Sequence, residues 1–193
     1  MRIAISGSHC CGKSTLIEEF LLVNPGFIHE PEPYTTLQED YGESFADPPA
    51  LLDFHRQLTF NSERLGSYCR GQDVIFERSP VDFVAYMMAL VSLGREHNHG
   101  RLIEQSLILA KEAIQCLDVL MFVRTNDRDY GAVDESEDPE LRNEVDRRLE
   151  AIILDDEIDL LATGPVVVEG IGSTTQRLET LNRALRTNSI ARS

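Results

Sequence analysis

Short apolar runs alternate with longer amphipathic segments along the whole chain. Each run is rich in Val, Ile, Leu, Met or Phe, which is typical of strands buried inside a sheet. The runs predict strands at residues 2–6, 27–28, 73–76, 119–123 and 165–168. Apolar residues at helical spacing predict helices over residues 13–23, 50–69, 81–91, 102–113, 140–154 and 173–185. This alternation predicts a three-layer α/β domain, with about five parallel strands flanked by helices.

Three segments depart from this alternation. Residues 30–34 read Glu-Pro-Glu-Pro-Tyr, and the two prolines lead us to expect neither a regular helix nor a central strand there. Residues 125–140 are acidic and show no period, which predicts a mobile excursion, and the chain after about residue 186 is expected to be a ragged tail. The length of 193 residues fits a single domain over residues 1–193.

The chain is acidic, with a formal net charge of −15. Residues 127–159 alone hold fourteen Asp and Glu against four Arg. A nucleic-acid-binding protein needs a basic face to contact phosphates, so we expect no nucleic acid as partner. An anionic ligand would need a local positive site and a recruited cation. The chain has only two lysines, Lys13 and Lys111, which makes their positions informative.

No apolar run approaches the roughly 18–20 residues that span a bilayer, and no secretion signal is recognisable. We therefore expect a cytoplasmic protein without a membrane partner. The four cysteines, at positions 10, 11, 69 and 116, lack the spacing of a zinc site and are expected to be reduced thiols.

Residues 7–14 read Gly-Ser-His-Cys-Cys-Gly-Lys-Ser and match the pattern G-x-x-x-x-G-K-[ST] between a predicted strand and a predicted helix. Glycine at both ends allows backbone conformations that point successive N–H groups at phosphate oxygens. Lys13 supplies charge for the β- and γ-phosphates, the helix N-terminus adds a partial positive charge, and the Ser14 hydroxyl is a ligand for Mg²⁺. The motif, called a P-loop, predicts nucleotide contacts at Gly7, Ser8, His9, Cys10, Cys11, Gly12, Lys13, Ser14 and Thr15.

Two further strand ends carry residues that could act on a phosphoryl group. Glu30 and Glu32 follow the second predicted strand, and Glu77 and Arg78 follow the third. Ligands in open parallel sheets lie beyond the carboxyl ends of the strands, where these side chains would meet the P-loop. A carboxylate there can orient an attacking hydroxyl and accept its proton, and an arginine can hold that carboxylate or the transferring charge.

These motifs resemble those of the P-loop kinases of nucleosides and nucleotides, most closely the deoxynucleoside-kinase and ribosylnicotinamide-kinase-like branch. The resemblance rests on the P-loop, on Glu30-Pro31 after the second strand and on Glu77-Arg78-Ser79 after the third. It covers essentially the whole chain, and it implies a P-loop NTPase fold with a lid over about residues 125–148. It also implies that Gly172 and Ser173, in the loop after the last strand, wrap the adenine of ATP.

The resemblance also implies roles for single residues. Glu30 would be the general base, with Glu32 as its rival in the same segment, and Glu77 would lie near the Mg²⁺ ion. Arg78 would pair with the base or with phosphate. Tyr34 stands where this family often has an aromatic residue beside the acceptor, although ordinary packing explains it equally well.

The lid departs from the family pattern, since its arginines, Arg128 and Arg142, stand among many acids. Arg128 is the first choice for a catalytic arginine, with Arg124 and Arg142 behind it. The acidic lid disfavours a phosphorylated acceptor and favours an uncharged, nucleoside-like hydroxyl compound.

The leading hypothesis is a kinase that uses ATP and Mg²⁺ to phosphorylate a small-molecule hydroxyl. The alternative is an ATPase or nucleotide-dependent switch that acts on a protein partner. Such ATPases usually have an apolar strand that ends in Asp or Asp-Glu. The strand predicted at residues 119–123 ends in Arg124 instead, although Glu77 after the third strand could take the place of that acid. The sequence has no Asn-Lys-x-Asp guanine reader. Apolar helix faces allow a homodimer, and Cys10 or Cys11 at a helix N-terminus could be a reactive thiolate.

Overall fold

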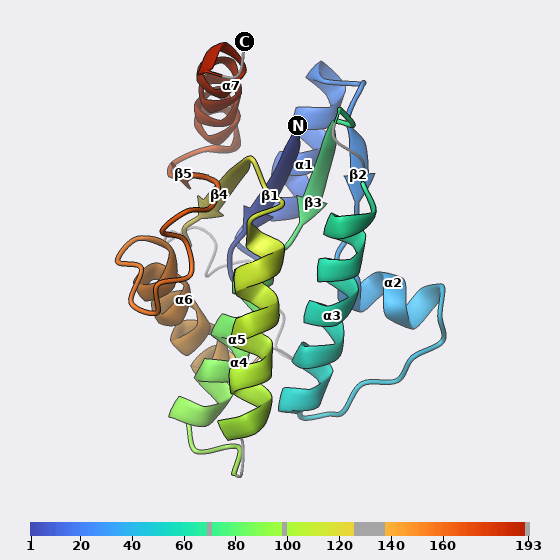
Figure 1. Cartoon of the computed structure of the whole chain (residues 1–193), viewed down its shortest axis with the longest axis vertical. Coiled ribbons are helices and arrows are strands. Elements are labelled where there is room, and N and C mark those ends of the chain that lie inside the picture. Colours follow the sequence, from blue (N-terminus) through green and yellow to red (C-terminus); the bar gives the residue numbers. More distant parts are fainter. Residues whose placement is uncertain (69–70, 98–99, 126–137, 192–193) are drawn as a thin grey trace.

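The computed structural model describes residues 1–68, 71–97, 100–125 and 138–191. Five strands form one sheet: β1 (Arg2–Ser6), β2 (Ile28–Glu30), β3 (Val74–Glu77), β4 (Val119–Val123) and β5 (Val166–Gly170). The helices of the described chain are α1 (Lys13–Val23), α2 (Pro33–Glu39), α3 (Leu51–Ser67), α4 (Pro80–Ser92), α5 (Gly100–Ile114), α6 (Pro139–Ile153) and α7 (Thr174–Ala191). Figure 1 shows their arrangement around the sheet.

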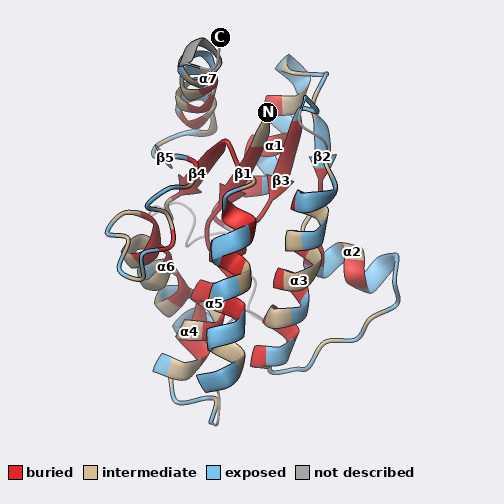
Figure 2. Cartoon of the chain, in the orientation of Figure 1, coloured by how far each residue is buried: buried red, intermediate tan, exposed pale blue. Residues whose placement is uncertain are grey.

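All strand pairs are parallel, and the strand order is β2-β3-β1-β4-β5. The central strand β1 places Ile3 between Ile75 of β3 and Val119 of β4. Because strand side chains alternate between the two faces, Ile3 and Ile5 face α1 and α7, whereas Ala4 faces the layer of α3 to α6. The expected three-layer P-loop fold is confirmed, and Figure 2 shows its buried residues along the strands and the inner helix faces.

Most predicted elements are present within two or three residues of their expected bounds, but two expectations were wrong. Residues 33–39 form α2, because Pro33 takes the first helical position, where its missing N–H would have had no helical partner. The expected ragged tail belongs instead to α7, which runs to Ala191. Most of the predicted acidic excursion and lid, residues 126–137, lies outside the described residues.

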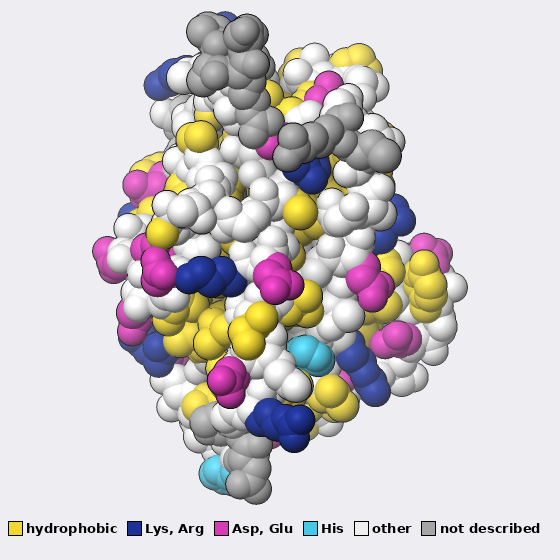
Figure 3. All heavy atoms as spheres, in the orientation of Figure 1, with side chains coloured by type: hydrophobic (Ala, Val, Ile, Leu, Met, Phe, Trp, Pro, Cys, Tyr) yellow, Lys and Arg dark blue, Asp and Glu magenta, His cyan; other side chains and the backbone are white. Residues whose placement is uncertain are grey.

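Among the described residues, no helix is both long and apolar enough to cross a membrane. On the face shown in Figure 3, the described Asp and Glu side chains are spread among the Lys and Arg side chains rather than separated from them. This face therefore presents mixed charge.

A buried carboxylate joins the end of β1, the start of the P-loop and the residues that follow β3. Asp82, in the first turn of α4, is completely buried and accepts hydrogen bonds from the Gly7 N–H at 3.0 Å and the Ser6 hydroxyl at 2.6 Å. It also accepts from the Ser79 N–H at 2.8 Å, as part of the N-terminal cap of α4. One side chain thus fixes the end of β1, the end of β3 and the first residue of the P-loop relative to one another.

We predict that Asp82→Ala strongly destabilises the protein, because it leaves several buried donors without an acceptor. The expected loss in the free energy of unfolding is about 3 kcal/mol, measured by urea denaturation. Asp82→Asn keeps one acceptor oxygen and should lose less. Equal stability of Asp82→Ala and the unchanged protein would show that this network does not support the fold.

Candidate functional site

The P-loop connects β1 to α1, and both of its glycines are required by geometry. A Cβ on Gly7 would lie 2.6 Å from the Cys11 sulfur and 2.7 Å from the Val123 carbonyl oxygen. Gly12, directly before α1, has a φ of +88°, in the left-handed region that other residues rarely adopt. The loop is therefore packed tightly against the end of β4 and turns sharply into the helix.

A hollow of about 400 Å³, here called the loop hollow, lies at this turn. It is lined by His9, Cys10, Gly12, Lys13, Ser14, Thr15, Glu32 and Glu77. Of the other predicted P-loop contacts, Ser8 and Cys11 are buried beneath it. Lys13 is 4 % exposed, and its ammonium group donates to the Ser8 carbonyl at 2.6 Å. The loop hollow thus combines the positive end of a helix with a lysine, the chemistry that holds a nucleotide phosphate.

Ser14 and Glu77 meet at one wall of the loop hollow. The Ser14 hydroxyl donates to the Glu77 carboxylate at 2.7 Å, and the imidazole of His29 lies 4.0 Å from the other carboxylate oxygen. A hydroxyl and a carboxylate are hard oxygen ligands, and Mg²⁺ is usually held by one or two such groups together with phosphate and water. Among the described residues, no group of three or more His, Cys, Asp or Glu side chains is placed to hold a metal ion.

The buried Arg78 forms an ion pair with the half-buried Glu32 beside the P-loop. The Nε of Arg78 donates to the Glu32 carboxylate at 2.7 Å, and its Nη1 donates to the Gly7 carbonyl at 2.5 Å. Burial by itself raises the pKa of Glu32, but attraction to Arg78 and Lys13 outweighs burial, so the net pKa is lowered. Glu32 is thus held as a carboxylate against the loop.

The two candidate bases, Glu30 and Glu32, have different surroundings. Glu30 is buried at the end of β2, where Arg64 of α3 donates to its carboxylate through Nε at 2.9 Å and through Nη2. The Tyr68 hydroxyl donates to the same carboxylate. Glu30 does not line the loop hollow, and its described contacts connect β2 to α3. The geometry therefore brings Glu32, rather than Glu30, to the P-loop.

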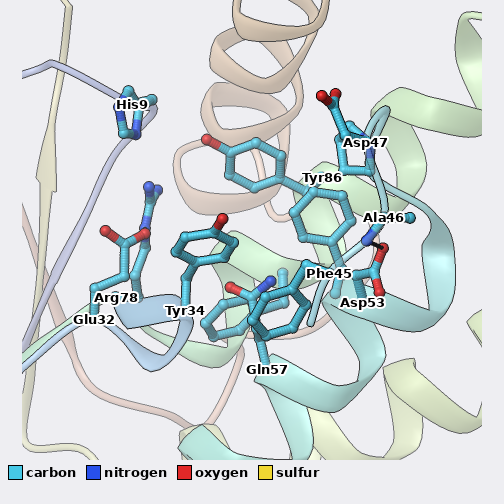
Figure 4. A pocket seen from close by; sticks show the side chains of 13 residues that line it. His9, Glu32, Tyr34, Phe45, Ala46, Asp47, Asp53, Gln57, Arg78 and Tyr86 are labelled. Atoms are coloured by element: carbon cyan, nitrogen blue, oxygen red, sulfur yellow. Dashed lines mark hydrogen bonds and ion pairs between the residues drawn. The ribbon is translucent and has the colours of Figure 1, made fainter. Parts of the chain in front are cut away.

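A second hollow of about 460 Å³, here called the aromatic hollow, adjoins the first (Figure 4). Its lining residues are His9, Glu32, Tyr34, Phe45, Ala46, Asp47, Pro49, Asp53, Phe54, Gln57, Arg78, Phe83 and Tyr86. Two ring pairs stack within this lining, Tyr34 on Phe45 with centroids 4.8 Å apart and Phe54 on Tyr86 at 4.7 Å. Burial raises the pKa of Tyr86 to about 12, so the phenol stays protonated and able to donate.

The predicted lid arginines contribute little to either hollow in the described part of the chain. Arg128 lies outside the described residues. Arg124 pairs with Glu150 of α6 and lies 3.4 Å from Glu169 of β5, and Arg142 is buried within α6.

Arg177 of α7 is a site residue that the sequence interpretation missed. It is 3 % exposed, and its guanidinium donates to the carbonyls of Cys11 at 2.8 Å and Arg124 at 3.0 Å. It therefore holds the underside of the P-loop to the end of β4. The sequence spacing could have indicated its burial. Arg177 stands four residues before Leu181 and eight before Leu185, on the buried face of α7.

The loop that was predicted to contact adenine includes Gly172 and Ser173. Gly172 has a φ of +87°, and the Ser173 N–H donates to the Gln176 side chain at 2.8 Å, so the loop is a compact turn into α7 outside both hollows.

Cys11 is completely buried, and burial raises the pKa of its thiol despite nearby Lys13. Burial thus disfavours a reactive thiolate at Cys11, and the hypothesis stays a prediction for the half-buried Cys10.

Comparisons with solved structures give the same fold at low sequence identity. Deoxyadenosine kinase from M. mycoides with bound dATP matches with a TM-score of 0.67 and 16% identity, covering 96% of this chain and 100% of that chain. The same enzyme with bound dCTP matches with a TM-score of 0.68 and 17% identity, covering 97% and 100%. Thymidylate kinase from Candida albicans matches with a TM-score of 0.65 and 15% identity, covering 97% and 92%.

A search of functionally curated proteins finds no match. A family model described as an AAA domain matches residues 2–189, nearly the whole chain. With the P-loop geometry and the parallel sheet described above, this match shows that the chain belongs to this AAA domain family and has the fold of the P-loop nucleoside and nucleotide kinases.

Proposed function

We propose that the protein is a kinase that transfers the γ-phosphoryl group of ATP, in the presence of Mg²⁺, to a hydroxyl group of a small nucleoside-like molecule. One observation carries the proposal: the Glu32 carboxylate lines both the loop hollow, which contains Lys13, and the aromatic hollow. A base for phosphoryl transfer must reach the acceptor hydroxyl on one side and face the phosphate on the other.

The aromatic hollow suits a flat ring. Its stacked pairs, Tyr34 with Phe45 and Phe54 with Tyr86, offer ring faces and edges against which a heterocycle can pack. Gln57 of α3 is buried in the lining, and its amide can both donate and accept a hydrogen bond. An apolar pocket with a few polar groups is typical of sites for small organic ligands.

The charges of the aromatic hollow favour an acceptor without a phosphate. Glu32, Asp47 and Asp53 line it, whereas its only lysine or arginine among the described residues is Arg78. The Arg78 guanidinium already contacts Glu32, the Gly7 carbonyl and Asp82. A phosphorylated acceptor would bring two further negative charges beside three carboxylates, so a nucleoside fits the hollow better than a nucleoside monophosphate.

The proposed reaction gives distinct roles to Lys13, Ser14, Glu77, Glu32 and Arg78. Lys13 and the P-loop N–H groups hold the phosphates, and Ser14 and Glu77 would hold the magnesium ion. When bound, Mg²⁺ neutralises the charge on the β- and γ-phosphates. Glu32 orients the acceptor hydroxyl and accepts its proton as the hydroxyl oxygen bonds to the γ-phosphorus and the bond to ADP breaks. Arg78 keeps Glu32 ionised and in place.

The proposal predicts that purified protein releases ADP from Mg·ATP faster when a suitable acceptor is present. The panel is a set of nucleosides, the matching nucleoside monophosphates and ribosylnicotinamide, with products identified by mass spectrometry. Acceleration by an unphosphorylated member, with its monophosphate as product, is the expected result. ADP release that no acceptor changes would favour the ATPase or switch instead.

Lys13→Ala is expected to reduce turnover by more than about 100-fold, because the β- and γ-phosphates lose their nearest cation. Circular dichroism and the urea midpoint should show that the variant still folds. Full activity in a folded Lys13→Ala protein would remove the P-loop from the mechanism.

Glu32→Gln is expected to lower kcat by about 100-fold, because the amide cannot accept the hydroxyl proton. ATP affinity, measured by equilibrium dialysis, should change little. Glu30→Gln is the matched comparison: it should weaken the link between β2 and α3 and lower the urea midpoint while most of kcat remains. The reverse pattern, with kcat lost only in Glu30→Gln, would restore Glu30 as the base.

A further inference from the structure

Two described residues, Glu32 and His9, line both the loop hollow and the aromatic hollow. Glu32 has a role in the proposed reaction, whereas the side chain of His9 has none so far. His9 is the third residue of the P-loop and is exposed, and Figure 4 shows its imidazole extending from the loop on the side of Arg78 and Glu32. His9 therefore stands where a phosphoryl group would pass from donor to acceptor.

The charged groups around this boundary come from several elements. Lys13 of α1 and Glu77 of β3 line the loop hollow, and Arg78 lines the aromatic hollow. His9 lies close enough to Glu32 to lower the pKa of that carboxyl by electrostatic attraction. The imidazole and the proposed base thus share one electrostatic environment, into which the γ-phosphoryl group would enter.

Phosphoryl transfer needs hydrogen-bond donors at this position, because charge is spread over the three outer oxygens of the moving group. The described arginines of the predicted lid, and Arg124 just before it, form ion pairs elsewhere or are buried. Arg124 pairs with Glu150, Arg147 and Arg148 pair with Glu144, and Arg142 is buried in α6. An imidazole N–H from the P-loop is one donor that the described structure places at the boundary, near Lys13 and Arg78.

We propose that His9 is a further catalytic residue, whose imidazole N–H donates a hydrogen bond to an outer oxygen of the transferring phosphoryl group. This role rests on the proposed kinase function and extends it, since the P-loop motif places no requirement on the residue at this position. The donor acts in cis, from the same loop that holds the phosphates. The hydrogen bond from His9 strengthens as negative charge develops on the phosphoryl oxygens. It therefore lowers the activation barrier more than it increases the affinity for ATP.

The test compares His9→Ala with His9→Gln, which keeps an N–H donor near the same position. The backbone of His9 does not have a positive φ, unlike that of the neighbouring Cys10. Both alanine and glutamine therefore fit the backbone at position 9. We expect His9→Ala to lower kcat by about 100-fold, as loss of one transition-state donor does, with the Kd for ATP within about twofold. His9→Gln should recover a large part of kcat. His97→Gln, which removes an exposed imidazole after α4, is the control and should behave as the unchanged protein.

Three results would overturn the role of His9: unchanged kcat in His9→Ala, a loss of ATP affinity as large as the loss of kcat, or a His9→Gln protein as slow as His9→Ala. The second would show that His9 only shapes the P-loop. An unchanged protein that phosphorylates no acceptor would instead reject the kinase function, and this role with it. Failure of the two proposals is therefore distinguishable.

Discussion

The buried guanidinium of Arg78 connects the parts of the site that must act together. It contacts Glu32 from the start of α2, the Gly7 carbonyl at the start of the P-loop and Asp82 of α4. Its backbone has a φ of +83°, a conformation that costs a non-glycine residue about 1–3 kcal/mol and persists only where the surroundings enforce it. The strained backbone directs a fully buried cation between two carboxylates, so the positions of the proposed base and the phosphate loop depend on one side chain.

An acidic chain must concentrate its few cations to hold a phosphate. Lys13 and Arg78 are buried around the P-loop, and Arg177 lies beneath it. Carbonyl oxygens of the loop accept from all three, so the cations order the backbone whose N–H groups would face the ligand. Buried charges interact more strongly than exposed ones and are less screened by salt. The net charge of −15 is therefore compatible with an anion site.

The sequence was sufficient for the fold because its strands are short apolar runs with clear boundaries. It was insufficient for the site wherever the answer depended on distant contacts. Glu30 and Glu32 are two residues apart and chemically identical, yet one ends a strand against α3 and the other starts a helix against the P-loop. Arg177 contacts a carbonyl 166 residues earlier, a distance that no local pattern encodes. The prolines of residues 30–34 misled because proline at a first helical position favours the helix.

The lowered pKa of Glu32 makes it a weak base, which fits phosphoryl transfer better than a strong base would. In a loose transition state the hydroxyl oxygen has formed little bond to phosphorus, so its proton leaves late and needs an ordered acceptor more than a basic one. The ion pair that lowers the pKa is also what fixes the carboxylate in space. Catalysis in this arrangement would come chiefly from position and charge, with Glu32 oriented toward the acceptor, His9 at the boundary between the two hollows and Lys13 on the donor side.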